Sequence, residues 1–167
     1  HHVCRRQRQM CIRDRTGREK ESGCVFCNRL ACDDREHYVL HRGTHWYIIL
    51  NLYPYNGGHM LLVLNRHQPN LGACTPEELA EMGSLLSLME NALREAFQPD
   101  GFNCGYNGGT SAGAGIPEHL HVHLLPRWSG DTNFMSTVGE TRVMPLTLDQ
   151  AFEKLAPVVE RLAGSPG

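Results

Sequence analysis

The chain has 167 residues, a formal net charge of −2, 41% hydrophobic residues and 20% charged residues. A chain of this length is expected to form one domain that buries about 70% of the surface of the unfolded chain. The small net charge gives no global basic excess for binding a nucleic-acid duplex. No apolar run approaches the roughly 18 residues that predict a membrane span. The composition is typical of a soluble globular protein.

The N-terminal stretch, residues 1–16, differs from the rest of the chain. It contains five arginines and has no amphipathic period. One interpretation is a phosphate- or RNA-binding arm. The interpretation that we favour is a disordered or non-native extension that fold reasoning should exclude. We therefore predict a single domain over residues 17–164.

The cysteines predict a reducing compartment. There are seven, an odd number, and no signal-peptide pattern is evident, so reduced thiols in the cytoplasm are expected. Cys24 and Cys27 have the Cys-x-x-Cys spacing at which two thiolates can share one tetrahedral metal. This pair alone is half a site, and two free thiols on a loop are the alternative. A thioredoxin-type pair is less expected, because no βαβ pattern follows.

Two apolar strands are predicted around a turn. Residues 46–50 are aromatic and β-branched, residues 54–58 have turn composition, and residues 59–64 form the second strand. Strands this apolar are expected at the centre of a sheet, covered on both faces. Asn51 lies where the first strand enters the turn, and an Asn there often bonds its own backbone. Tyr55 is interpreted as turn packing.

Two helices are predicted by capping boxes. Thr75 and Glu78 open a long helix whose Leu/Met stripe is expected to lie on the sheet. Residues 147–150 have capping-box form and open a C-terminal helix, which Pro157 should kink or interrupt. Antiparallel strands with these two helices predict an α+β fold.

The most distinctive stretch is residues 119–124, where three histidines alternate with leucine, valine and leucine. Period two predicts a β-strand with one buried face, on which His119, His121 and His123 point the same way. On a helix they would spread over about 200°. The alternatives are a surface strand with a polar face, a metal platform, and nucleophilic catalysis by one imidazole flanked by two helpers. Spacing alone does not separate the last two.

A glycine-rich loop precedes the histidines. A short strand, residues 102–106, leads into residues 107–115, which are rich in glycine and small polar side chains. Such a loop exposes backbone N–H groups that can form an anion-binding nest. It lacks the Gly-Lys-Ser/Thr ending of a Walker loop and enters a strand instead of a helix. The combination suggests a phosphate held against imidazoles.

The His-x-His-x-His run with two following aliphatics, after a Gly-rich loop and an Asn, resembles the histidine triad (HIT) superfamily of nucleotide hydrolases and transferases. Residues 126–134 resemble the branch near the fragile-histidine-triad and diadenosine tetraphosphate hydrolases and phosphorylases. The resemblance extends from about Gly23 to about Leu162. It implies a HIT-like α+β fold, with a mostly antiparallel central sheet, a long helix and a C-terminal helix, and a homodimer.

The resemblance also implies roles for the histidines. His121 is expected to attack the α-phosphorus through its unprotonated nitrogen, with the other nitrogen donating to a fixed acceptor. His123 is expected to hydrogen-bond the phosphate oxygens. His119 supports the phosphate site or, if zinc binds, holds the sheet edge. His59 matches the histidine that packs behind the triad and steadies it.

Four further residues match nucleotide contacts of the family. Asn51 matches the ribose-hydroxyl binder and Asn107 the amide that bonds the phosphates. The backbone of Gly113 and Gly115 could stabilise phosphate charge. Gly115 stands where diadenosine tetraphosphate phosphorylases often carry Ser, a departure that argues against phosphorolysis without proving hydrolysis.

Zinc-carrying relatives complete their Cys-x-x-Cys pair with two histidines. The matching positions here are His67 and His119, so the resemblance implies structural zinc on Cys24, Cys27, His67 and His119. The attack on phosphorus needs no metal, although the substrate's polyphosphate is expected to carry magnesium.

The implied function is a nucleotide hydrolase or nucleotidyl transferase that cleaves dinucleoside polyphosphates, or related nucleoside phosphoesters, through a nucleotidyl-histidine intermediate. A dinucleoside tetraphosphate phosphorylase is one alternative. A nucleotide-binding module with little turnover is another. A hydrolase with three histidines around a metal-bound water is a third, but ligands at i, i+2 and i+4 on one strand converge poorly.

Overall fold

The computed structural model describes residues 12–13, 19–20, 23–131 and 146–164. Residues 132–134 of the stretch that resembles the fragile-histidine-triad branch lie outside the described residues, as does most of the N-terminal extension. In this part of the chain, β1 (Ile12–Arg13) lies within the extension and pairs with β2 (Glu19–Lys20), which follows it, in a two-stranded antiparallel sheet.

The domain is built on a five-stranded sheet in the order β3-β4-β5-β7-β6, antiparallel throughout. The strands are β3 (Val39–Arg42), β4 (Trp46–Leu50), β5 (Met60–Leu64), β6 (Gly101–Gly105) and β7 (His121–Arg127). The predicted hairpin is confirmed as β4 and β5. Strand β3 was not predicted, because its four residues have no alternating pattern.

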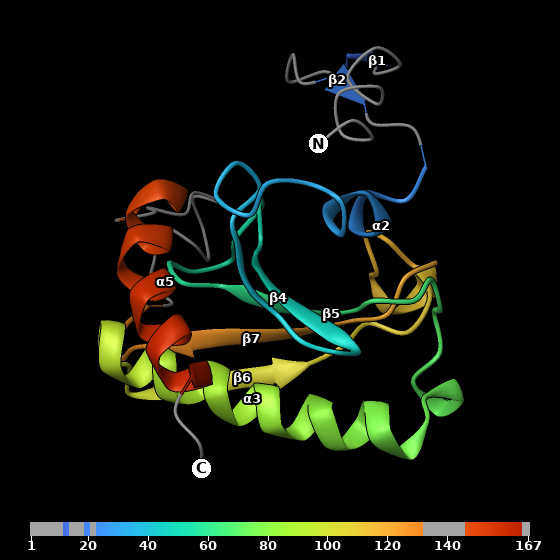
Figure 1. The fold of residues 1–167 in the computed structure, drawn as a ribbon. Coiled ribbons are helices and arrows are strands. Elements are labelled where there is room, and N and C mark those ends of the chain that lie inside the picture. Colours follow the sequence, from blue (N-terminus) through green and yellow to red (C-terminus); the bar gives the residue numbers. More distant parts are fainter. Residues whose placement is uncertain (1–11, 14–18, 21–22, 132–145, 165–167) are drawn as a thin grey trace.

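Within the described residues, three helices pack on this sheet: α2 (Val25–Arg29), α3 (Pro76–Phe97) and α5 (Leu148–Gly164). Short 3₁₀ turns, η1 (Leu71–Ala73) and η2 (Thr110–Ala112), lie in the connections. In Figure 1, α3 and α5 lie on one side of the sheet and α2 on the other. None of the helices in the described part of the chain combines the length and hydrophobicity that a bilayer crossing requires.

The central strands are buried on both faces, as predicted. Along β4, Trp46, Ile48 and Leu50 join the larger core with α3 and α5. Tyr47 and Ile49 point to the opposite face, where they pack in a second cluster with Phe26 of α2. This division follows from the alternation of side chains along a strand. The side chains of β4 are therefore divided between the larger core with α3 and α5 and the smaller cluster with α2.

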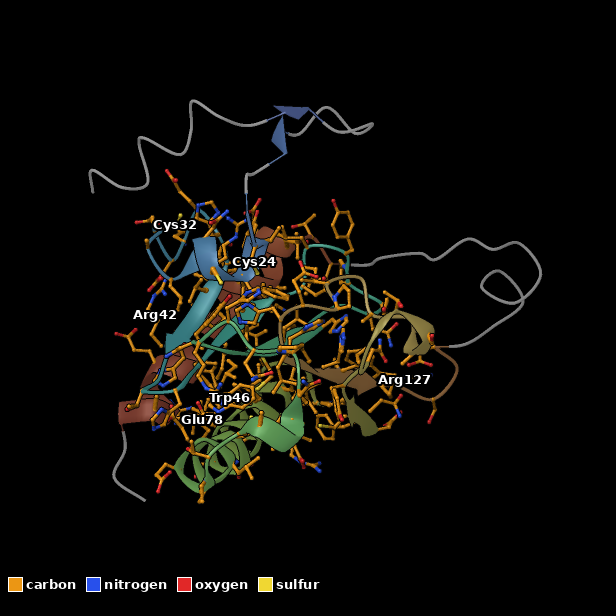
Figure 2. The ribbon with its side chains drawn as sticks, turned by 90° about the vertical axis from the view of Figure 1, so that its right-hand side faces the viewer. Cys24, Cys32, Arg42, Trp46, Glu78 and Arg127 are labelled. Carbon is orange, nitrogen blue, oxygen red and sulfur yellow. The ribbon has the colours of Figure 1, made fainter. Side chains whose placement is uncertain are left out.

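The predicted capping boxes are confirmed. The Glu78 backbone N–H donates to Thr75 Oγ1 at 3.2 Å and the Thr75 N–H to Glu78 Oε2 at 2.8 Å. Thr147 and Gln150 make the same reciprocal pair at the start of α5. Figure 2 shows Trp46 and Glu78 side by side at α3, where the Trp46 indole donates to the Glu78 carbonyl.

Pro157 was predicted to kink or interrupt the C-terminal helix. The interruption was wrong, because α5 continues through this residue. Phe152, Leu155 and Val159 are buried on both sides of the proline in the sequence. Their packing against the core offsets the hydrogen bond that proline cannot donate.

Replacing Leu62, which is fully buried on β5, by Ala should lower the free energy of unfolding by about 2–5 kcal/mol, because the large core loses apolar contacts and gains a cavity. Leu79→Ala on α3, where the side chain is 41% exposed, is the matched control and should change stability by about 0.5 kcal/mol or less. Urea unfolding measures both. Equal effects would contradict this placement of the core.

Candidate active site and metal site

The three histidines share one face of the sheet, as their alternation predicts. Leu120, Val122 and Leu124 belong to the large core, whereas the rings of His119 and His121 both contact Phe26 on the opposite face. The prediction that all three histidines lie within the strand was wrong, because β7 begins at His121. Just before it, the Leu120 N–H donates to the Gln68 carbonyl, which lies beyond the end of β5.

His121 has a defined hydrogen-bonding state. Its Nδ1 lies 2.7 Å from the carbonyl oxygen of His119. A carbonyl only accepts, so Nδ1 carries the hydrogen and, in the neutral ring, Nε2 keeps its lone pair. His121 as a residue is 7% exposed, and burial lowers the pKa of its imidazole. This imidazole is therefore neutral near pH 7, with a free electron pair on Nε2.

His59 and His123 form a second hydrogen-bonded pair beside it. The backbone N–H of Tyr55 donates to His59 Nδ1 at 3.1 Å, so the hydrogen of a neutral His59 ring is on Nε2. His59 Nε2 lies 2.9 Å from His123 Nδ1 and donates to it. The hydrogen of a neutral His123 must then be on Nε2.

The Nε2 atom of His123 is buried and has no hydrogen-bond partner within the described part of the chain. Buried polar atoms without partners are rare in folded proteins. His121 and His123 have ring centroids 5.1 Å apart. A group placed between them could therefore accept a hydrogen bond from His123 and meet the lone pair of His121.

Two aromatic residues of this site were missed from the sequence. Phe26 packs against His119 and His121, with ring centroids 5.4 and 4.9 Å away. Tyr55, interpreted from the sequence as turn packing, stacks on His123 with an interplanar angle of 12°. The position of Tyr55 four residues before His59 in a tight turn was the available signal.

The predicted nucleotide-contact residues lie in two connections: Asn51 follows β4, and Asn107, Gly113 and Gly115 lie between β6 and β7. Asn51 accepts the Tyr53 N–H at 3.0 Å, which is the bond of the turn alternative. Its amide also donates to the His59 ring. Asn107 is half-buried before η2. The Gly113 N–H is used within η2, bonded to the Thr110 carbonyl, whereas Gly115 is exposed. Ribose and phosphate contacts by these residues stay predictions.

Four side chains converge on a possible metal position at the other end of the histidine row. One donor atom from each of Cys24, Cys27, His67 and His119 lies within 4.8 Å of the others. The Cys24 and Cys27 sulfurs are 3.2 and 3.5 Å from His119 Nδ1, and Cys27 is 3.4 Å from His67 Nδ1. Tetrahedral zinc with these ligands requires edges of about 3.3–3.8 Å. The predicted four-residue cluster therefore forms, and it could hold a metal.

The orientation of His119 suits a ligand. Its Nε2 donates to the Leu64 carbonyl at 2.6 Å, which leaves the Nδ1 lone pair facing the two thiols. Burial, followed by the neighbouring Cys24, raises the pKa of the Cys27 thiol. Two thiolates this close need a cation, which zinc would supply. Cys27 lies in α2 and Cys24 is its N-cap residue, so the pair lies at the start of a helix and not on a loop.

A family model for the HIT domain matches residues 34–130. The match covers more than half of the chain. The chain belongs to the HIT family. The resemblance inferred from the histidine strand is thereby confirmed, and so is the HIT-like α+β fold.

This HIT protein is 42% identical over 123 residues to the AP-4-A phosphorylase of Mycobacterium tuberculosis, an alignment of 74% of this chain and 63% of that protein. It is 31% identical to adenylylsulfatase HINT3 of Arabidopsis thaliana, over 84% of this chain and 70% of that protein. The chain thus spans less than two thirds of the mycobacterial relative.

Among solved structures, a zinc-bound histidine triad family protein of Mycobacterium smegmatis superposes with a TM-score of 0.69 and 25% identity. The superposition covers 86% of this chain and 98% of that one. The described cysteines of the present HIT protein are free thiols, so none is withdrawn from metal binding by a disulfide.

Cys27→Ser should remove most bound zinc, because one of four convergent donors loses its thiolate. At a zinc concentration 100-fold above its Kd, the metal stabilises the native state by about 2.7 kcal/mol, so chelation should lower Tm in the wild type and not in the variant. Elemental analysis and thermal melting measure both effects. Cys104→Ser, at an exposed cysteine of β6, is the control. Equal zinc contents in the two variants would contradict the site.

Acidification should destabilise the fold through His59 and His123. Burial, reinforced by neighbouring histidines, lowers their pKa values from 6.5 to about 3 and about 4. At pH 5 the unfolded chain therefore binds about two more protons at these residues than the native state. The resulting stability is present above pH 6.5 and is lost as pH falls from there through the two folded-state pKa values, about 4 for His123 and about 3 for His59.

His59→Gln should reduce proton uptake on unfolding at pH 5 by about one. The pH dependence of urea unfolding measures this uptake. Leu62→Ala lowers stability without removing a titratable group, so it should retain the wild-type slope. An unchanged slope in His59→Gln would show that this imidazole is not kept neutral by the fold.

Proposed function

We propose that this protein cleaves dinucleoside polyphosphates, or related nucleoside phosphoesters, at the α-phosphate through a nucleotidyl intermediate on His121. The observation that carries the proposal is the His121 ring itself, whose Nδ1 is committed to the His119 carbonyl while Nε2 is left unprotonated. The relationship to enzymes named AP-4-A phosphorylase and bis(5'-nucleosyl)-tetraphosphatase supports the substrate class.

The reaction has two displacements. In the first, the Nε2 lone pair of His121 forms a bond to the α-phosphorus, and the bond from phosphorus to the bridging oxygen breaks. The electron pair leaves with the polyphosphate. In the second, water attacks the same phosphorus, the N–P bond breaks, and its electrons return to Nε2. The water oxygen stays on the nucleoside monophosphate, and the water releases a proton.

Throughout both steps Nδ1 keeps its hydrogen bond to the His119 carbonyl. This bond stabilises the positive charge that the ring gains when Nε2 bonds to phosphorus. The His123 Nε2–H donates to a phosphoryl oxygen, where negative charge grows in each transition state. His59 holds His123 in this donor state. Asn51, Asn107, Gly113 and Gly115 are proposed to contact the ribose and phosphates.

Zinc is proposed to be structural in this protein. Bound by Cys24, Cys27, His67 and His119, it would supply a fixed link between α2, the chain after β5 and the entry to β7. The convergence of the four donor atoms supports this. All four positions are filled by protein ligands, as is typical of structural zinc. Magnesium that arrives with the substrate, a homodimer and a cytoplasmic location remain predictions.

Phosphorolysis is the second candidate reaction. The 42% identity to a protein named AP-4-A phosphorylase favours it. Inorganic phosphate would then replace water as the second nucleophile, and the product would be a nucleoside diphosphate in place of a monophosphate. Products formed from diadenosine tetraphosphate with and without inorganic phosphate separate the two reactions.

His121→Asn should lower kcat by about 10⁴-fold or more, the scale of losing a nucleophile that works with its neighbours. The amide cannot bond to phosphorus. Release of nucleotide from diadenosine tetraphosphate, followed chromatographically, measures the rate.

The matched control is His41→Asn on the edge strand β3, where no site residue lies, and it should retain wild-type turnover. A His121→Asn variant with the wild-type rate would rule out covalent catalysis at this residue.

A further inference from the structure

We propose that Asn56, Asp131 and Arg127 form a clamp that positions the turn after β4, so that the Tyr55 backbone N–H selects the tautomer of His59 and thereby keeps the donor hydrogen on His123 Nε2. This inference rests on the proposed function, because it explains how the donor to the phosphoryl group is prepared. The three clamp residues act through other groups and are positioning residues.

The clamp is a dense set of hydrogen bonds at the end of β7. Arg127 is the last residue of that strand, and its Nε and Nη2 donate to the two oxygens of Asp131, each at 2.6 Å. A bidentate pair of this kind fixes direction as well as distance. Asp131 is only 13% exposed, so solvent competes weakly for its oxygens.

Asn56 connects this ion pair to the turn. Its side-chain amide donates to Asp131 Oδ2 at 3.1 Å and to the Pro126 carbonyl at 3.2 Å. Both acceptors belong to β7 or to the chain that follows it, whereas Asn56 itself lies between β4 and β5. The amide therefore fixes the turn against the strand that carries His121 and His123.

The opposite side of the turn is fixed by packing on α3. Gly58 has φ +84°, and a Cβ placed there would lie 2.9 Å from the Phe97 ring. The turn also closes on itself, since the His59 N–H donates to the Asn56 carbonyl at 3.2 Å. With α3 on one side and the clamp on the other, the backbone N–H of Tyr55 is held 3.1 Å from His59 Nδ1.

The hydrogen bonds of the turn determine which nitrogen of His59 and of His123 carries the hydrogen. A backbone N–H can only donate, so the Tyr55 contact stabilises the His59 tautomer with hydrogen on Nε2. The Asn51 side-chain amide, 3.3 Å from the same Nδ1, donates to it as well, and the two contacts favour the same tautomer. That hydrogen points to His123 Nδ1, and the His123 hydrogen is left on the unpartnered Nε2. If the turn shifted, His59 could carry its hydrogen on Nδ1, and His123 could present a lone pair to phosphate in place of a donor.

The clamp lies apart from the metal cluster, as Figure 2 shows by the separation of Arg127 from Cys24. A neighbouring hydrogen bond of the same loop does not belong to the clamp. Asp100 accepts the Ser129 N–H at 2.7 Å and so holds the same loop as Asp131, but within the described residues its carboxylate bonds Ser129 and not the turn. Asp100→Ala is therefore a matched control for loss of a loop hydrogen bond.

The test compares Asn56→Ala with Asp100→Ala in the full chain. In long-range ¹H–¹⁵N spectra of the ligand-free protein, protonated and unprotonated imidazole nitrogens give separate signals, and His59→Gln and His123→Gln assign the two rings. Asn56→Ala should change His59 from a single Nε2–H tautomer to a mixture.

The same variant should also turn over more slowly. With diadenosine tetraphosphate, kcat should fall by about 10- to 100-fold, the scale of a displaced catalytic group, while KM changes much less. Asp100→Ala should change neither.

Asp131→Asn repeats the test if Asn56→Ala does not fold, because its amide weakens the contacts to Arg127 and Asn56 at nearly constant volume. Wild-type His59 signals and kcat in the clamp variants would overturn the proposal. Equal losses in the clamp variants and Asp100→Ala would also overturn it, since a general loosening of the loop explains them. If the wild-type chain cleaves no dinucleoside polyphosphate, the proposed function fails, while the nitrogen spectra still decide the tautomer.

Discussion

The hydrogen bond from His121 Nδ1 to the His119 carbonyl determines which nitrogen of the central imidazole is free. Without it, the neutral ring would exchange between two tautomers, and only one of them presents an electron pair at Nε2. Burial adds to this selection, because it lowers the pKa of His121 and so favours the neutral ring. The same arrangement leaves Nε2 as the atom able to form a bond with phosphorus.

His119 links that hydrogen bond to the rest of the fold through three different atoms. Its carbonyl accepts from His121, its Nε2 donates to the Leu64 carbonyl, and its Nδ1 faces the two cysteines. A metal bound by the four-residue cluster would restrain this residue and, with it, the carbonyl that orients His121. In the proposed reaction, structural metal binding and the orientation of the nucleophile would therefore depend on one residue, and the metal would take no part in the displacement.

Local patterns predicted the local features well. Alternation placed the histidines on one face, and the capping boxes at Thr75 and Thr147 are present. The start of β7 was misplaced, because it depends on a hydrogen bond from Leu120 to Gln68, about 50 residues earlier in the sequence. Tyr55 was missed because its contacts also depend on residues distant in the sequence. It reaches His59 and His123 from a turn that β7 and α3 hold in place. The cluster around Cys24 was predicted from the family resemblance and not from spacing, since its four ligands come from three separate parts of the chain.

The most direct measurement is mass spectrometry of the protein quenched within milliseconds of mixing with diadenosine tetraphosphate. The account predicts that one adenylyl group is attached to the chain, that fragmentation locates it on His121, and that it disappears as product accumulates. An adduct located on another residue would contradict the account. So would turnover at full rate with no adduct formed at any time point.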